Sequence, residues 1–147
     1  MKLSEIMTRE VEIAQPDDSL QSVAKKMRDR DIGFLPVCDG EVLLGALSDR
    51  DITIRALADG MDVNIMLARD LMTTPAISCF EDQDVREAAK IMEENQIRRL
   101  VILSRDGKSV VGIVSLGDLA RNGTANLSGK VLQKVSELET SEPAKNV

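Results

Sequence analysis

The chain has almost no aromatic residues and no histidine. Aromatic side chains make up 1% of its 147 residues, and neither Trp nor Tyr occurs. Proteins that bind single-stranded nucleic acid stack its bases on aromatic side chains, so this scarcity argues against such a partner. The missing histidine removes the commonest general acid or base and the commonest metal ligand. The composition therefore favours neither an enzyme nor a metal-binding protein.

Positive charge is also in short supply. The chain carries 19 Lys and Arg against 25 Asp and Glu, a formal net charge of −6. Binding to a phosphate backbone requires a basic face, which this balance does not favour. No run approaches the ~18 apolar residues of a membrane span, and residues 1–11 lack the apolar stretch of a signal peptide. We therefore expect a cytoplasmic protein that binds neither nucleic acid nor a membrane.

Two cysteines, Cys38 and Cys79, stand in apolar runs typical of strands. We interpret them as small buried hydrophobic residues. A disulfide framework or a zinc site would need more ligands at tighter spacing. The sequence also contains no glycine-rich phosphate loop and no convincing acid–base pair. We predict a protein without catalytic residues, without a bound metal and without a required cofactor.

The chain contains an internal repeat. Glu5-Ile6-Met7-Thr8 returns as Asp70-Leu71-Met72-Thr73, 65 residues further on. A unit of about sixty residues buries too little surface for a robust core of its own, so we expect two repeats to pack together and close one core. The predicted organisation is a first repeat at 1–60, a linker at 61–67, a second repeat at 68–122 and a tail at 123–147.

Each repeat shows the same order of elements: strand, helix, strand, strand, helix. Apolar residues recur at helical spacing on 19–30 and 84–95, which predicts that one face of each helix is buried. In the first helix that face consists of Leu20, Val23, Ala24 and Met27. Asp-Gly between apolar runs predicts a hairpin in each repeat. The remaining predicted ranges are strands at 11–13, 34–38, 42–47, 76–79, 100–103 and 110–114, and helices at 49–58 and 116–121. The expected fold is α/β, with two βαββα repeats related by a pseudo-twofold.

The tail follows a different pattern. Its apolar residues predict a short amphipathic helix over 128–139, with one face formed by Val131, Leu132, Val135 and Leu138. Residues 140–147 contain a proline and few apolar side chains, which predicts disorder. The sequence leaves open whether the helix packs on its own chain or on a second subunit.

A glycine–serine–aspartate turn stands at the same place in both repeats, where the last strand enters the last helix. It reads Gly45-x-x-Ser48-x-x-Asp51 in the first repeat and Gly112-x-x-Ser115-x-x-Asp118 in the second. Unpaired N–H groups at a helix start attract an anion, and the serine can donate to a phosphate oxygen. The aspartate can accept hydrogen bonds from a ribose, and the glycine leaves room for a base. The alternative needs no ligand, because Ser-x-x-Asp is also close to a helix capping box.

Several arginines stand close to these turns in the predicted fold. Arg98 and Arg99 precede the strand at 100–103, where the first repeat has Gly33-Phe34. Two adjacent cations there can hold a phosphate, although neighbouring side chains diverge along a strand and one of the two is expected to face the site. Arg50 and Arg55 on the helix at 49–58 are secondary candidates. The alternative is that these charges are simply solvated.

Residues 3–122 resemble a tandem pair of cystathionine-beta-synthase (CBS) domains, also known as a Bateman module. The resemblance lies in the Met-Thr openings, the Leu35-Pro36-Val37 strand and the two turns. It implies two clefts between the repeats that bind adenosine-type ligands: AMP, ADP or ATP, and in some members S-adenosylmethionine or NADH. It also implies a homodimer, and a regulatory role exerted through a change of conformation or assembly on an unknown effector protein. The alternative is a ligand-free dimerisation or protein-interaction domain.

The resemblance also implies roles for single residues. Asp51 and Asp118 match ribose-binding aspartates, and Ser48 and Ser115 match the serine positions beside them. Further implied ligand contacts are Arg98 and Arg99 to a phosphate, Arg50 nearby, and the backbone of Val11 and Ala76 to an adenine. Gly33-Phe34 departs from the basic pattern, which implies unequal occupancy of the two clefts. The absence of histidine departs from metal-binding relatives, so no zinc site is expected.

Overall fold

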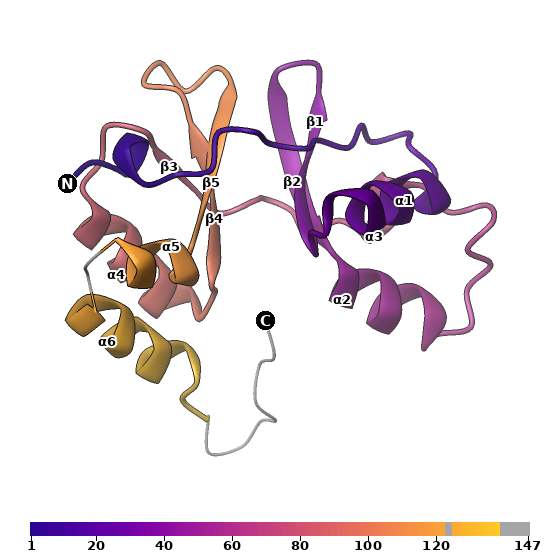
Figure 1. Ribbon diagram of the computed structural model, residues 1–147. Helices are drawn as coiled ribbons and strands as arrows, with labels where there is room; N and C mark the ends of the chain where they lie inside the picture. The colour runs from indigo at the N-terminus through magenta and orange to yellow at the C-terminus, as the bar shows by residue number, and fades with distance from the viewer. Residues whose placement is uncertain (123–124, 139–147) are drawn as a thin grey trace. The chain divides into compact units, whose positions relative to one another are not determined.

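The structure is a computed structural model, and it describes residues 1–122 and 125–138. These residues form two compact units (Figure 1). The first-repeat unit is Val11–Ala76, and the second-repeat unit combines Met1–Glu10 with the described residues from Ile77 onward. Each unit therefore holds the body of one repeat together with the opening segment of the other. These opening segments are residues 61–76 in the first-repeat unit and Met1–Glu10 in the second-repeat unit. Residues 140–147, for which the sequence predicts disorder, lie outside the described residues.

The first-repeat unit is built on a two-stranded hairpin. Strands β1 (Phe34–Asp39) and β2 (Val42–Ser48) pair antiparallel, and Gly40 makes the turn at a φ of 60° that glycine adopts without strain. The helices are α1 (Leu20–Arg30), α2 (Asp49–Asp51), its π-helical continuation (Ile52–Leu57), and α3 (Ala68–Leu71). The helix predicted over 19–30 and the hairpin are confirmed, and Ser19 caps α1 by accepting a hydrogen bond from Ser22 N–H at 3.1 Å.

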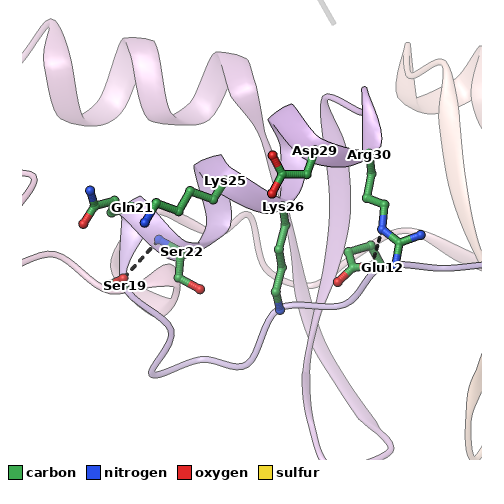
Figure 2. Close-up of a pocket in the computed structure, with 8 residues that line it drawn as sticks. All are labelled: Glu12, Ser19, Gln21, Ser22, Lys25, Lys26, Asp29 and Arg30. Atoms are coloured by element: carbon green, nitrogen blue, oxygen red, sulfur yellow. Dashed lines mark hydrogen bonds and ion pairs between the residues drawn. The ribbon is translucent and has the colours of Figure 1, made fainter.

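The strand predicted over residues 11–13 is wrong. Within the described residues, a single parallel bridge to β1, one residue further on, stands in its place. Two side chains of α1 hold the segment: Lys26 Nζ donates to the Ile13 carbonyl at 2.8 Å, and Arg30 pairs with Glu12 at 3.4 Å (Figure 2). The backbone hydrogen bonds to β1 are made by Ala14, whose N–H donates to the Pro36 carbonyl and whose carbonyl accepts from Cys38 N–H, both at 2.9 Å.

The second-repeat unit contains a three-stranded sheet in the order β3–β4–β5. Strand β3 (Ser78–Phe80) pairs parallel with β4 (Arg99–Leu103), and β4 pairs antiparallel with β5 (Val110–Ser115). The helices are α4 (Val85–Asn95), α5 (Leu116–Arg121) and α6 (Ala125–Val135), and a 3-10 turn spans Leu3–Glu5. The predicted strands and helices of the second repeat are confirmed, although β3 begins two residues later than expected.

The two opening segments dock in equivalent ways. In the first-repeat unit, Ala68 N–H donates to the Asp18 carbonyl at 2.8 Å, and Thr73 pairs antiparallel with Ala46 on β2. The equivalent pairs in the second-repeat unit are Leu3 with Gln83 and Thr8 with Ile113. Each opening segment thus adds a bridge to the strand that leads into the serine–aspartate turn.

Each unit has a hydrophobic cluster of its own, whereas the sequence predicts one core closed by both repeats. The opening segments account for the difference, since each adds apolar side chains to the unit on which it docks. They contribute Met66, Ala68 and Leu71 to the first-repeat unit, and Leu3, Ile6 and Met7 to the second-repeat unit. Ala24 of α1 is exposed, contrary to the prediction, whereas its counterpart Ala89 is buried. Cys38 and Cys79 are buried and free, as predicted.

Helix α6 packs against α4 and α5 of the second-repeat unit (Figure 1). Its buried face consists of Ser128, Val131 and Val135. Leu132 and Leu138, which the sequence places on that face, are 47% and 70% exposed. The helix begins three residues earlier than predicted and ends four residues earlier, so Leu138 lies beyond its end. Within the part of the chain that the structure describes, no helix combines the length and apolar content needed to cross a membrane.

Candidate functional site

The serine and aspartate of each turn form a reciprocal helix cap. In the second-repeat unit, Asp118 N–H donates to Ser115 Oγ at 3.1 Å, and Ser115 N–H donates to Asp118 Oδ2 at 2.7 Å. The corresponding distances between Ser48 and Asp51 are 3.1 and 2.9 Å. These contacts form the capping box that the sequence offered as the ligand-free alternative. The same four side chains thus begin α5 and α2.

The expectation that N–H groups at these helix starts point outward unpaired is wrong for α2. Asp49 N–H donates to the Gly33 carbonyl at 2.9 Å, Arg50 N–H to Asp49 Oδ1 at 2.8 Å, and Asp51 N–H to the serine. At α5, Leu116 N–H donates to the Arg98 carbonyl at 2.8 Å, and Asp118 N–H is likewise bound. A phosphate at the turn that begins α2 would therefore have to be bound by side chains.

The room beside the two glycines is filled by the chain itself. A Cβ atom at Gly45 would lie 2.6 Å from the Thr73 carbonyl oxygen, and one at Gly112 would lie 2.6 Å from Met7 Sδ and 3.0 Å from the Thr8 carbonyl oxygen. These glycines admit the opening segments of the other repeat, not a base as the sequence suggested. The Met-Thr opening of each repeat therefore packs against the turn glycine of the other repeat, where a larger residue would not fit.

Each aspartate also binds an arginine on its own helix. Arg121 pairs with Asp118 Oδ1, and the Asp118 side chain is only 8% exposed. Arg55 lies 3.6 Å from Asp51 Oδ1, and the Asp51 side chain is 18% exposed. The sequence analysis did not include Arg121, although its spacing of three residues from Asp118 on one helix was the available signal.

Strand register brings Arg99 and Ser115 together. The two residues face each other in the β4–β5 pairing, so their side chains leave the sheet on the same side. Phe34 holds the equivalent position opposite Ser48 in the first-repeat unit. Arg99 is exposed, and within the described residues its guanidinium makes no hydrogen bond or ion pair. The second-repeat turn therefore has a free cation beside it where the first-repeat turn has an aromatic ring.

The remaining residues with predicted ligand contacts are Arg98, Arg50, Val11 and Ala76. Arg98 and Arg50 are exposed, and their backbones support the helix starts as described above. Val11 and Ala76 are half-buried and form the two ends of the first-repeat unit. In the part of the chain that the structure describes, no group of three or more Cys, Asp or Glu side chains is arranged to hold a metal ion.

Comparison with known proteins identifies the family. A model of the CBS domain matches residues 3–57 and 68–124. The chain belongs to the CBS-domain family and carries two such domains. The family and the α/β fold of two CBS repeats, both predicted from the sequence, are thereby confirmed.

Several known proteins are similar to this chain over most of its length. The CBS domain-containing protein YhcV of Bacillus subtilis is 36% identical over 135 residues, which cover 91% of this chain and 94% of that protein. Hypoxic Response Protein I, whose crystal structure holds two coordinated zinc ions, is 36% identical with a TM-score of 0.74, covering 83% and 98% of the two chains. The CBS domain pair of protein MJ0100, in complex with 5′-methylthioadenosine and S-adenosylmethionine, is 26% identical with a TM-score of 0.75, covering 86% and 98%.

Proposed function

We propose that this CBS-domain pair is a non-enzymatic regulatory module that binds an adenosine-type ligand at its serine–aspartate turns. The observation that carries the proposal is the placement of the free Arg99 guanidinium opposite Ser115, at the turn that Asp118 completes. A carboxylate, a hydroxyl and a guanidinium at one turn suit the ribose and the phosphate of a nucleotide. The complex of the similar MJ0100 domain pair with two adenosine compounds supports this ligand class.

We assign a ligand contact to each of these groups from the hydrogen bonds that it already makes. Asp118 Oδ2 is used by the cap, which leaves lone pairs of the carboxylate for ribose hydroxyls. Ser115 Oγ accepts from Asp118 N–H, so its hydrogen is available for a phosphate oxygen. Arg99 supplies the charge that the bound N–H groups of the helix start cannot supply. The phosphate contact in this proposal therefore depends on arginine.

The two turns differ in the ligand that they suit. Phe34, opposite Ser48, offers an apolar surface and no charge. We assign the phosphorylated ligand (AMP, ADP or ATP) to the turn of the second-repeat unit. An adenosine compound with an uncharged or cationic 5′ group, such as 5′-methylthioadenosine or S-adenosylmethionine, is the better match for the turn of the first-repeat unit. Neither role needs a metal or another cofactor.

Regulation requires that the ligand bind one state of the protein more tightly than another. The states concerned are a conformational pair or a change in assembly, with a homodimer as the proposed form and an effector protein as the proposed recipient. A ligand with equal affinity for both states would transmit nothing. Measurement of the oligomeric state with and without ligand therefore belongs to any test of this role.

A thermal-shift panel tests the proposal directly. The panel holds AMP, ADP, ATP, adenosine, S-adenosylmethionine and NADH at millimolar concentration, with CTP as the control for non-specific anion binding. A ligand at a hundredfold excess over its Kd stabilises the native state by about 2.7 kcal/mol, so the midpoint should rise clearly. If none of the adenosine compounds raises the midpoint above that with CTP, the proposal is wrong.

A ligand-free interaction domain is the second candidate function. The observation that favours it is the complete capping box at both turns, which satisfies serine and aspartate without any ligand. The two candidates differ in what a charge-removing substitution at Asp118 does to ligand affinity: it weakens binding for a ligand-binding module and changes only stability for a ligand-free domain.

A further inference from the structure

The two aspartates of the turns are covered by arginines that are held in different ways. Arg121 is 70% exposed, and Asp118 is the partner that the described residues provide for its guanidinium. Arg55, by contrast, donates to the Leu71 carbonyl at 2.9 Å and also lies 3.6 Å from Asp51. Leu71 ends α3 in the opening segment docked on that unit. Arg55 is thus anchored by a second element, whereas the contact of Arg121 joins two residues of one short helix.

The sequence around Arg121 gives its side chain room over the turn. A Cβ atom at position 117 would lie 3.1 Å from Arg121 Nη1 and 3.5 Å from Ser115 Oγ, and glycine occupies that position. The guanidinium and the hydroxyl that the proposed phosphate contact uses therefore both lie beside Gly117. The equivalent positions in the first repeat, 67 residues earlier, hold Arg50 and Ile54, so this arrangement is confined to the second-repeat unit.

The carboxylate oxygen that Arg121 binds is the one that a ribose needs. Asp118 Oδ2 already accepts from Ser115 N–H in the cap, which leaves Oδ1 as the less committed oxygen. With only 8% of the side chain exposed, access to that oxygen is narrow. A guanidinium and a pair of ribose hydroxyls cannot both approach it freely.

We infer that Arg121 is a movable arm that covers Asp118 in the ligand-free protein and must leave it before a ribose binds. This inference rests on the proposed function and adds a residue that sets the affinity of that site. The Arg121 side chain is largely solvated, so the ion pair costs little to break when ribose hydroxyls replace it, and the arm weakens binding without preventing it. Once displaced, the guanidinium is still close to Ser115, where a phosphate gives it a new partner and adenosine does not.

Adenosine is the sharpest probe, because it carries a ribose and no charge. Arg121→Ala should bind adenosine roughly fivefold more tightly than the wild-type protein, because no ion pair with a solvated guanidinium has to be broken first. The ratio of AMP affinity to adenosine affinity should fall, since the variant lacks the guanidinium that the phosphate would bind. Salt screens exposed ion pairs, so raising KCl should tighten adenosine binding to the wild type and leave the variant unchanged.

The experiment measures adenosine and AMP binding to the full chain by calorimetry at low and high KCl. Arg105→Ala is the matched control: Arg105 is exposed, lies in the same unit and pairs with Asp82 at 3.2 Å, away from the turn. Thermal midpoints of all three proteins separate a change in affinity from a change in stability. A gain in adenosine affinity for Arg121→Ala that shrinks at high salt, without a gain for Arg105→Ala, supports the arm.

Two results would overturn the inference, and they are distinguishable. In the first, the wild type binds adenosine or AMP, and Arg121→Ala binds adenosine equally or more weakly. The inference about Arg121 is then wrong, and the proposed function still holds. Failure of both ligands to bind the wild type and the variant alike removes the proposed function and the arm together.

Discussion

Ser115 and Asp118 hold each other in place: each backbone N–H donates to the other residue's side chain, at 2.7 and 3.1 Å. The residues to which we assign ligand contacts are therefore also those that begin α5. A loss of ligand binding in a variant of this pair can arise from a damaged helix start or from a missing contact. Substitutions that separate the two effects are needed.

Asp118→Asn provides that separation. The amide oxygen can still accept from Ser115 N–H, so we expect the free energy of unfolding to fall by about 1 kcal/mol or less. A ribose hydroxyl loses a charged acceptor, which should weaken AMP and adenosine about tenfold or more. Urea denaturation and calorimetry measure the two quantities.

Asp70→Asn is the control for this variant. Asp70 Oδ2 accepts a hydrogen bond from Leu67 N–H at 2.8 Å, the same contact that Asp118 makes with Ser115 N–H, but with no serine in the turn. Its substitution should alter stability to a similar extent and leave affinity unchanged. Full ligand affinity in Asp118→Asn would favour the ligand-free interaction domain.

Arg99→Ala tests the phosphate contact. Removing one charge-assisted hydrogen bond should weaken AMP about tenfold and adenosine little, since Arg99 has no role toward an uncharged ligand. The two Kd values, measured side by side by calorimetry, check this expectation. Arg105→Ala removes an exposed arginine elsewhere in the unit and should change neither value. Equal losses for AMP and adenosine would exclude a phosphate role for Arg99.

Gly45→Ala tests the docking of the opening segment. The new Cβ would lie 2.6 Å from the Thr73 carbonyl oxygen, a backbone atom that is held in a bridge to Ala46. We expect a loss of about 2 kcal/mol in the free energy of unfolding, measured by urea denaturation. Gly129→Ala in α6 is the control, because its Cβ would meet open space and alanine favours a helix by about 1 kcal/mol. Unchanged stability in Gly45→Ala would contradict the packing role.

Cys79 should make the protein less stable in alkali. Burial, with a smaller effect of the nearby Glu87 charge, raises the pKa of the Cys79 thiol to about 11. The folded state therefore keeps a proton that the unfolded state releases above about pH 8.5. Its contribution to stability is complete below that pH and declines as the pH rises toward 11.

Denaturation at a series of pH values, with Cys79→Ala for comparison, measures this decline. The variant should lose less stability than the wild type between pH 8.5 and 10. Parallel slopes for the two proteins would show that the thiol does not cause the decline.

The sequence alone determined the parts of this protein that depend on near neighbours. The hairpins at Asp-Gly, the helix begun by Ser19 and the capping of Ser48 by Asp51 all involve residues within a few positions of one another, and the repeat is recognised because such local patterns occur twice. Such patterns report local geometry directly, and in register twice they also identify the CBS family. The candidate residues Ser115, Asp118 and Arg99 could be selected in the same way.

Only the tertiary structure decided what lies beside those residues. Thr73 occupies the space at Gly45 and Met7 the space at Gly112, contacts that span 28 and 105 positions of the chain. Leu71 anchors Arg55, whereas the partner that the described residues give Arg121 is Asp118 on the same helix. Nothing in the residues around a glycine or an arginine encodes which distant segment will pack there. The packing partner of such a residue is set only in the folded protein, because it depends on how each unit completes its core with the opening segment of the other repeat.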